Sequence, residues 1–268
     1  MTDDAQKFAF TAIGYVRCEQ NYRYEAPRQA VFAENEGCIE LLSGHNYEQA
    51  ARDLKGFERI WVIFAFHLNE GWRPLVHPPI APPGRKISVF ATRAPYRPNS
   101  IGMSCVELTK VEGRKLYICN FDLLDGSPVL DIKPYIPQAD AFPQAVTGWL
   151  EEAQGEEYEV KIAPAALKMM HWIKAESGLD MENFALLQLG INPLAGKRKR
   201  IFTAPDDPEQ LEIGCRTWRI GFKIYRTPHI INVKYIRSNY TDEELRPETQ
   251  DHYKDKNLHR KFIKKKFV

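Results

Sequence analysis

The apolar run from Ile60 to Leu68 constrains the fold more than any other segment of this chain. Its sequence, IWVIFAFHL, is rich in β-branched and aromatic side chains. Such a run is too short and too rich in aromatic and branched side chains to favour a surface helix, and it is typical of a central strand. We therefore predict a central β-strand here.

Further short strands are expected around it. Residues 86–92, 102–109 and 115–124 alternate or cluster β-forming side chains, and connections bearing Pro, Gly and Asn separate them. Residues 8–16 and 37–42 are also β-like, while the apolar spacing over 47–54 predicts one helix that ends at Gly56. Many short strands with few helices indicate a barrel or a sandwich.

The segment from Trp72 to Gly84 contains five prolines. Proline fixes φ and lacks an amide donor, so this segment is expected to be an extended, stiff surface cover and not a member of a strand ladder.

After Pro143 the pattern changes to helix, with helices predicted over 164–177 and 180–189. Residues 217–225 and 229–236 then predict a β-hairpin, with Arg219 and Lys223 on one face of its first strand. The chain is thus expected to be mainly β, a small β-barrel followed by a smaller α+β domain. We divide it into residues 1–155, 156–241 and a basic, frayed tail over 242–268.

Several protein classes are disfavoured. The N-terminal residues lack the features of a signal peptide, and no segment reaches the roughly 18 apolar residues of a membrane span, so a cytoplasmic protein without membrane contact is expected. The five cysteines are widely spaced and do not predict a metal site; we expect reduced thiols that mostly fill the core. Motifs of Rossmann folds, phosphate loops and common hydrolases are missing.

The net charge of +2 hides an uneven distribution. Residues 196–268 contain 18 lysines and arginines against 10 acidic residues, whereas residues 1–195 contain 19 against 25. A basic C-terminal part is a candidate for binding a polyanion, although a solvated surface would show the same charge.

Polar side chains concentrate at the ends of the predicted strands, on loops stiffened by proline. Proline-braced loops of this kind suit a small-ligand site. Each loop also has a structural interpretation: a histidine after an apolar strand is often only a rim residue, and two arginines can simply brace loops. The segments are 26–29, 66–69, 92–102 and 125–135.

The sequences PRQ, WVIFAFHLNEGWRPLVHPP, VFATRAPYRPNSIGMS and DLLDGSPVLDIKPYIP closely resemble the TsaA-like domain of the TrmO family, the tRNA threonylcarbamoyladenosine N6-methyltransferases. The resemblance covers roughly residues 8–150. It implies a small β-barrel that binds S-adenosylmethionine, usually as a homodimer. It also implies methylation of N6 of threonylcarbamoyladenosine beside the tRNA anticodon.

The resemblance implies a methyl-donor pocket made of residues from each of the four segments. They are Pro27, Arg28, Gln29, His67, Leu68, Arg93, Cys105, Asp125, Gly126, Ser127 and Pro128. The C-terminal segment from Asn192 to Arg198 is a degenerate version of a family motif, through which Lys197 and Arg198 could hold the modified nucleotide.

Methyl transfer from a sulfonium requires mainly alignment of donor and acceptor, and the acceptor nitrogen must lose a proton. Asp131 and His67 are the candidate proton acceptors, with Tyr135 as an orienting hydroxyl. The candidate RNA-binding residues are Lys197, Arg198, Lys199, Arg200, Arg219 and Lys223. Two alternatives are a methyltransferase of the same barrel type acting on another RNA or a small molecule, and a noncatalytic RNA- or nucleotide-binding module.

Overall fold

The fold was analysed in a computed structural model. It describes residues 6–23, 25, 35–78, 80–82, 84–153, 156–191, 193–194, 201–205 and 207–267. The chain divides into two compact units, Met1–Glu151 and Glu152–Val268. No helix within the described ranges is long and apolar enough to cross a membrane.

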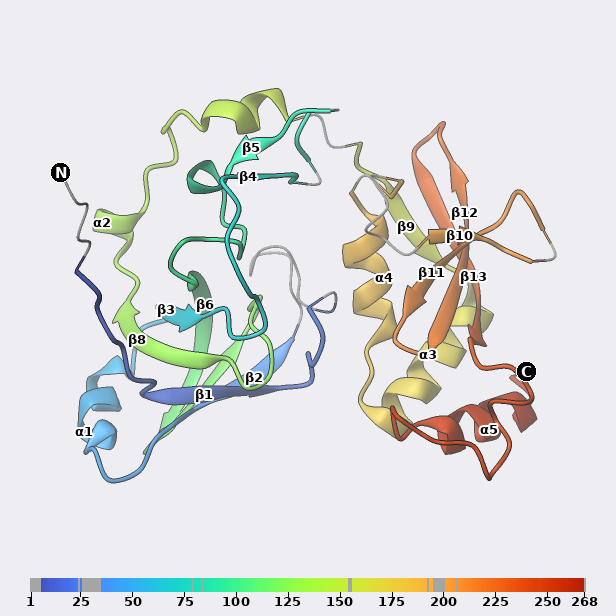
Figure 1. Ribbon diagram of the computed structural model, residues 1–268, viewed down its shortest axis with the longest axis horizontal. Coiled ribbons are helices and arrows are strands. Elements are labelled where there is room, and N and C mark those ends of the chain that lie inside the picture. The colour runs from blue at the N-terminus through green and yellow to red at the C-terminus, as the bar shows by residue number, and fades with distance from the viewer. Residues whose placement is uncertain are drawn as a thin grey trace. The chain divides into compact units, whose positions relative to one another are not determined.

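Unit 1 is a closed barrel of six antiparallel strands (Figure 1). The barrel closes because β8 pairs with β3 on one side and with β1 on the other. Around the barrel the order is β1 (Gly14–Cys18), β2 (Glu36–Leu41), β7 (Lys115–Cys119), β6 (Ile101–Glu112), β3 (Arg59–Ala65) and β8 (Pro128–Pro134).

Alternating burial along the strands builds the barrel core. In β3, Ile60, Val62 and Phe64 are buried while the residues between them are partly exposed. The ring of Phe64 lies over Gly102 of β6, where a Cβ would come within 2.4 Å of the ring, so the pair needs a residue without a side chain. The prediction of a central strand over 60–68 is confirmed for residues 60–65.

The short elements of unit 1 correct several expectations. Residues 86–92 form only the two-residue strand β5 (Ile87–Ser88) before a 3-10 turn, Val89–Ala91. The first strand begins at Gly14, not at residue 8. Within the proline-rich segment, β4 (Leu75–Val76) pairs with β5, so the expectation that this segment stays out of any ladder is wrong at these two residues.

Four further short elements complete the description of this part of the chain. The predicted helix over 47–54 is observed as α1 (Tyr47–Ala51) followed by a 3-10 turn, Arg52–Leu54. After the barrel come the short helix α2 (Pro137–Asp140) and a 3-10 turn, Gly148–Glu152. Trp149 donates from its indole nitrogen to the Ala91 carbonyl at 2.8 Å, which fastens this last segment to the loop after β5.

Unit 2 is an α+β fold whose sheet is continued by one parallel strand at its edge. In sheet order it contains β10 (Ile201–Thr203), β11 (Leu211–Cys215), β12 (Trp218–Tyr225), β13 (Ile230–Ser238) and β9 (Glu159–Ile162). Helix α3 (Pro164–Ser177) contacts β13, and α4 (Met181–Leu189) contacts β9 (Figure 1). Both predicted helices and the predicted hairpin are confirmed.

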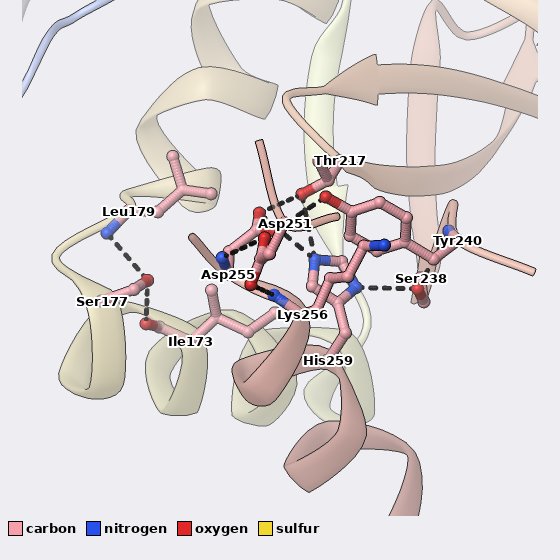
Figure 2. Close-up of polar contacts among 10 residues, drawn as sticks. All are labelled: Ile173, Ser177, Leu179, Thr217, Ser238, Tyr240, Asp251, Asp255, Lys256 and His259. Atoms are coloured by element: carbon pink, nitrogen blue, oxygen red, sulfur yellow. Dashed lines mark hydrogen bonds and ion pairs between the residues drawn. The ribbon is translucent and has the colours of Figure 1, made fainter. Parts of the chain in front are cut away.

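The expectation of a frayed tail over 242–268 is wrong for residues 256–264. Residues Lys256–Lys264 form helix α5, and its His259 and Phe262 are buried. The ring of His259 stacks on Trp218 with centroids 3.6 Å apart, and its two ring nitrogens meet Thr217 and Ser238 (Figure 2). The sequence did not predict this helix, because most of its residues are charged or polar. A few apolar and aromatic side chains on one side are enough to pack it against the rest of unit 2.

The cysteines fill the core less than expected. Only Cys215 is fully buried, whereas Cys18, Cys38, Cys105 and Cys119 are partly exposed, and none of the five forms a disulfide.

Candidate functional site

The turn that precedes β8 is fastened to the first strand by backbone hydrogen bonds. The amide of Asp125 donates to the Gln20 carbonyl at 2.8 Å, and the amide of Gly126 donates to the Val16 carbonyl at 2.9 Å. The carboxylate of Asp125 accepts from the amide of Cys18 at 3.0 Å. Gly126 has a φ of 71°, a conformation that favours glycine. Asp125 to Ser127 therefore form a rigid rim.

His67 faces this rim from the end of β3. A Cβ placed on Gly126 would have the His67 Nε2 as its one neighbour, at 3.9 Å, so the space above the turn is open up to the imidazole. His67 and Leu68 are both exposed. Two segments that lie about 60 residues apart in the sequence thus meet at one end of the barrel.

Two arginines of the loop after β5 have different roles. Arg97 donates to the carbonyls of Val89 and Thr92, at 3.0 and 2.7 Å, and so braces the loop. Arg93 is exposed and, within the described part of the chain, forms no hydrogen bond or ion pair. Its guanidinium is therefore available to a ligand, whereas that of Arg97 is already committed to the fold.

The charge of Arg93 reaches two groups of the barrel wall. Burial raises the pKa of the Cys105 thiol, and Arg59 and Arg93 both oppose that shift. Burial also raises the pKa of the Asp122 carboxyl, against the opposing effects of the Ser104 hydroxyl and Arg93. Arg93, Cys105 and the Ser104–Asp122 pair therefore lie in one electrostatic neighbourhood.

Asp131 and Tyr135 lie on the outward face of the barrel wall. Asp131 pairs across the ladder with Ile63, and its carboxylate forms an ion pair with Lys133 at 2.9 Å, both side chains being at least half exposed. Tyr135 packs against Trp61, with ring centroids 5.8 Å apart. Asp131 lies three residues along β8 from Pro128, about 10 Å in an extended strand.

Gln20 is a candidate site residue that the sequence analysis missed. Its side-chain Oε1 is buried and has no hydrogen-bond partner among the described residues, and its backbone carbonyl supports the Asp125 turn. A buried acceptor without a donor is costly and favours a ligand that supplies one. The sequence held no signal for this, because a lone Gln in a polar loop forms part of no recognisable pattern.

The predicted RNA-binding residues are only partly described. Arg219 donates to Asn239 at 2.8 Å and stacks over the Phe202 ring, and Lys223 pairs with Glu209 at 2.5 Å. These two cations are thus already engaged by neighbours. Lys197, Arg198, Lys199 and Arg200 lie outside the described residues, as do Asn192, Pro27, Arg28 and Gln29.

The described groups fit an S-adenosylmethionine molecule. A free guanidinium at Arg93 suits the methionine carboxylate, and the unpartnered Gln20 acceptor suits an amino or hydroxyl donor. The exposed imidazole of His67 and the rigid backbone at Gly126 lie next to each other, so one group of a ligand bound at this end of the barrel can contact both. Across the described ranges, no group of His, Cys, Asp and Glu side chains could hold a metal ion.

Comparison with known proteins gave consistent matches. The family described as "tRNA-methyltransferase O N-terminal domain" matches residues 15–141. The tRNA (adenine(37)-N6)-methyltransferase of Escherichia coli is 37% identical over 170 residues, 61% of this chain and 72% of that protein. The human protein of the same name is 37% identical over 139 residues, 50% of this chain and 31% of that protein.

Two matches come from Pseudomonas aeruginosa. RcsF, which its name assigns to the S-adenosylmethionine-dependent methyltransferases, is 39% identical over 162 residues, 55% of this chain and 70% of that protein. The crystal structure of TrmO from this organism superposes with a TM-score of 0.63 at 28% identity, covering 88% of this chain and 99% of that one.

The raised pKa of Asp122 predicts a pH dependence of stability. A carboxyl whose pKa is higher in the folded state stabilises the fold below its unfolded pKa and loses that contribution as pH rises through the folded pKa. The stability of Asp122→Asn relative to the parent should therefore rise between pH 4 and pH 7, by up to about 1.4 kcal/mol per pH unit of separation between the two pKa values. Urea unfolding at several pH values measures this, and a constant difference would contradict it.

Proposed function

The chain belongs to the tRNA-methyltransferase O family, and we propose from this premise that it methylates N6 of threonylcarbamoyladenosine beside the tRNA anticodon. The chain is an S-adenosylmethionine-dependent tRNA methyltransferase with the barrel of that family. The modified adenosine is the proposed acceptor, and tRNA that carries it is the proposed partner.

One observation carries the proposal at the level of this chain: His67, the Asp125–Ser127 turn and the free Arg93 belong to motifs shared with the family. The first two meet at one end of the barrel, and all of them carry polar groups that are open to a ligand. The implied pocket residues Leu68 and Pro128 belong to the same segments, and Cys105 lies in β6, which follows the 92–102 segment directly. A barrel that served only as a structural support would not need a buried amide oxygen such as that of Gln20, which has no donor among the described residues.

The donor supplies an electrophilic methyl group on a sulfonium. The protein must hold the donor so that this methyl points at the acceptor nitrogen, and most of the rate enhancement comes from that alignment. We assign Arg93 to the donor carboxylate and the backbone of Asp125–Ser127, with Gln20, to its ribose and adenine. His67 closes the pocket opposite the turn.

The acceptor nitrogen lies between a purine ring and a carbonyl, so it attacks readily only as its proton leaves. We propose that Asp131 accepts this proton. Asp131 lies on β8, which follows the Asp125–Ser127 turn. Its carboxylate is half exposed, forms an ion pair with Lys133 and accepts a hydrogen bond from the amide of Ile132 at 2.9 Å. Tyr135, on the same face, would orient the acceptor.

We propose a homodimer formed through unit 1, in the cytoplasm where tRNA is modified. Unit 1 exposes large apolar side chains on β6 and on the segment that follows β8, and burying such side chains against a second copy would stabilise a dimer. Light scattering should give about twice the 31.0 kDa chain mass. A monomer at micromolar concentration would contradict this. The exposed residues are Met103, Ile136, Phe142, Val146 and Leu150.

The two arginines of one loop provide a matched pair for testing donor binding. Arg93→Ala should weaken S-adenosylmethionine binding by about 10- to 100-fold, since a charge-assisted hydrogen bond is lost, and should leave the urea midpoint unchanged. Arg97→Ala should lower the free energy of unfolding by about 1–3 kcal/mol because the carbonyls of Val89 and Thr92 each lose one hydrogen bond. Calorimetric titration and urea unfolding measure both. Equal effects of the two variants on stability and binding would contradict the assignment.

Transfer of labelled methyl to tRNA tests the whole function. Label should enter tRNA that carries threonylcarbamoyladenosine and should not enter the same tRNA without that modification. Donor binding with no label in either tRNA would place the acceptor elsewhere and would favour a methyltransferase acting on another substrate.

Within the same assay, Asp131→Asn should lower kcat by about 10²- to 10⁴-fold, the usual contribution of a general base, with donor affinity retained. Lys133→Ala is the control for loss of the ion pair alone. A parallel loss of donor affinity in Asp131→Asn would assign the carboxylate to binding.

A further inference from the structure

The C-terminal end of α5 and the residues just after it carry an exposed cluster of positive charge. We name Lys261, Lys264, Lys265 and Lys266 the α5 basic cluster; all four are exposed. Residues 256–267 contain six lysines and arginines and no acidic residue. Lys261 pairs with Glu176 at 3.1 Å on the surface, and no described carboxylate lies within ion-pair distance of the other three.

A buried polar network holds α5 in place. Its centre is His259, which has no exposed surface and stacks on the Trp218 ring. Its two ring nitrogens form hydrogen bonds with Thr217 and Ser238 (Figure 2). Phe262 adds an edge-to-face contact with Trp218, with ring centroids 4.9 Å apart. The helix is therefore a fixed part of unit 2.

The first turn of α5 is fixed as firmly as its middle. Asp255, the residue before the helix, accepts hydrogen bonds from Thr217 at 2.5 Å and Tyr240 at 2.9 Å. Burial alone would raise the pKa of Asp255, but hydrogen bonds from His259, Thr217 and Tyr240 outweigh it and lower the pKa. Lys256 is almost fully buried and donates to Thr249 at 2.8 Å. The direction of the helix, and hence of its lysines, is set by these contacts.

The apolar side of α5 is already used inside the protein. A basic amphipathic helix that binds a membrane must bury its apolar face in the lipid. Here Phe262 packs on Trp218 and Trp172, so that side is not available. Apart from the exposed Ile263, the surface left for a partner consists mainly of cations, which suit a polyanion that is bound through its surface charge.

We propose that the α5 basic cluster binds backbone phosphates of the tRNA, as a contact surface additional to the methyl-transfer site. This inference rests on the proposed function, because that function supplies a polyanionic substrate. Arg219 and Lys223, the described cations expected from the sequence to meet RNA, are held by Asn239 and Glu209, whereas three of the four cluster lysines have no described carboxylate partner.

The test replaces all four cluster lysines with alanine in the full chain. Binding of threonylcarbamoyladenosine-containing tRNA should weaken at least tenfold at low salt. The slope of log affinity against log salt should flatten by about 3, since each phosphate contact contributes about 0.7 to 0.9. The KM for tRNA should rise, while kcat at saturating tRNA and the affinity for S-adenosylmethionine should not change.

A matched control removes the same charge elsewhere. Alanine at Lys55, Lys110, Lys115 and Lys161, all exposed, should leave the salt slope and the KM close to the parent values. An equal effect of the two quadruple variants would overturn the proposal, because net charge and not the α5 surface would then govern binding. Unchanged tRNA affinity in the cluster variant would overturn it as well.

Two further outcomes separate the possible failures. If the parent binds tRNA through the cluster but transfers no methyl to it, the proposed function fails while the contact surface stands. If the cluster variant loses binding to phosphatidylserine vesicles and keeps its affinity for tRNA, the surface serves a membrane and the proposal is overturned.

Discussion

Closure of the barrel by β8 is the constraint on which the candidate site depends. Val129 pairs with Gly14 of β1 and also with Phe64 of β3, so a single strand joins the first and third strands of the chain. The turn before β8 is therefore held against the first strand, and the residues that follow β3 lie next to this turn. His67 and Gly126 become neighbours through backbone pairing, and their own side chains need not attract each other.

At this end of the barrel, some polar side chains stabilise the loops and others of the same kind are proposed to bind the ligand. Arg97 donates its guanidinium hydrogens to two carbonyls of its own loop, and this bracing leaves Arg93 projecting without a described partner. The same division applies to Gln20, whose backbone supports the turn while its side-chain oxygen stays unpaired among the described residues. Unpaired polar groups beside a rigid backbone are costly to an empty fold and useful to one that binds a polar ligand.

In unit 2, a buried polar network holds α5 in position, whereas in unit 1 the closure of the barrel by β8 holds the candidate site together. The stacked rings of Trp218 and His259, together with Thr217, Ser238 and Asp255, fasten a highly charged helix to the sheet. Fully satisfied networks of this kind rigidify the elements they join. The lysines at the end of α5 are consequently displayed from a fixed support, which lowers the entropy lost when they meet a partner.

The sequence alone determined the β-rich first unit, the two helices and hairpin of the second, and the family motifs, because these depend on local periodicity, turn residues and short contiguous patterns. Only the tertiary structure decided that Arg97 braces its loop whereas Arg93 has no hydrogen bond or ion pair among the described residues, since both are arginines in one loop and their hydrogen-bond partners cannot be read from the sequence. It also decided that α5 is docked, because the ring that receives His259 lies 41 residues earlier in the chain. Contacts between distant segments follow from strand register and packing, which no local pattern records.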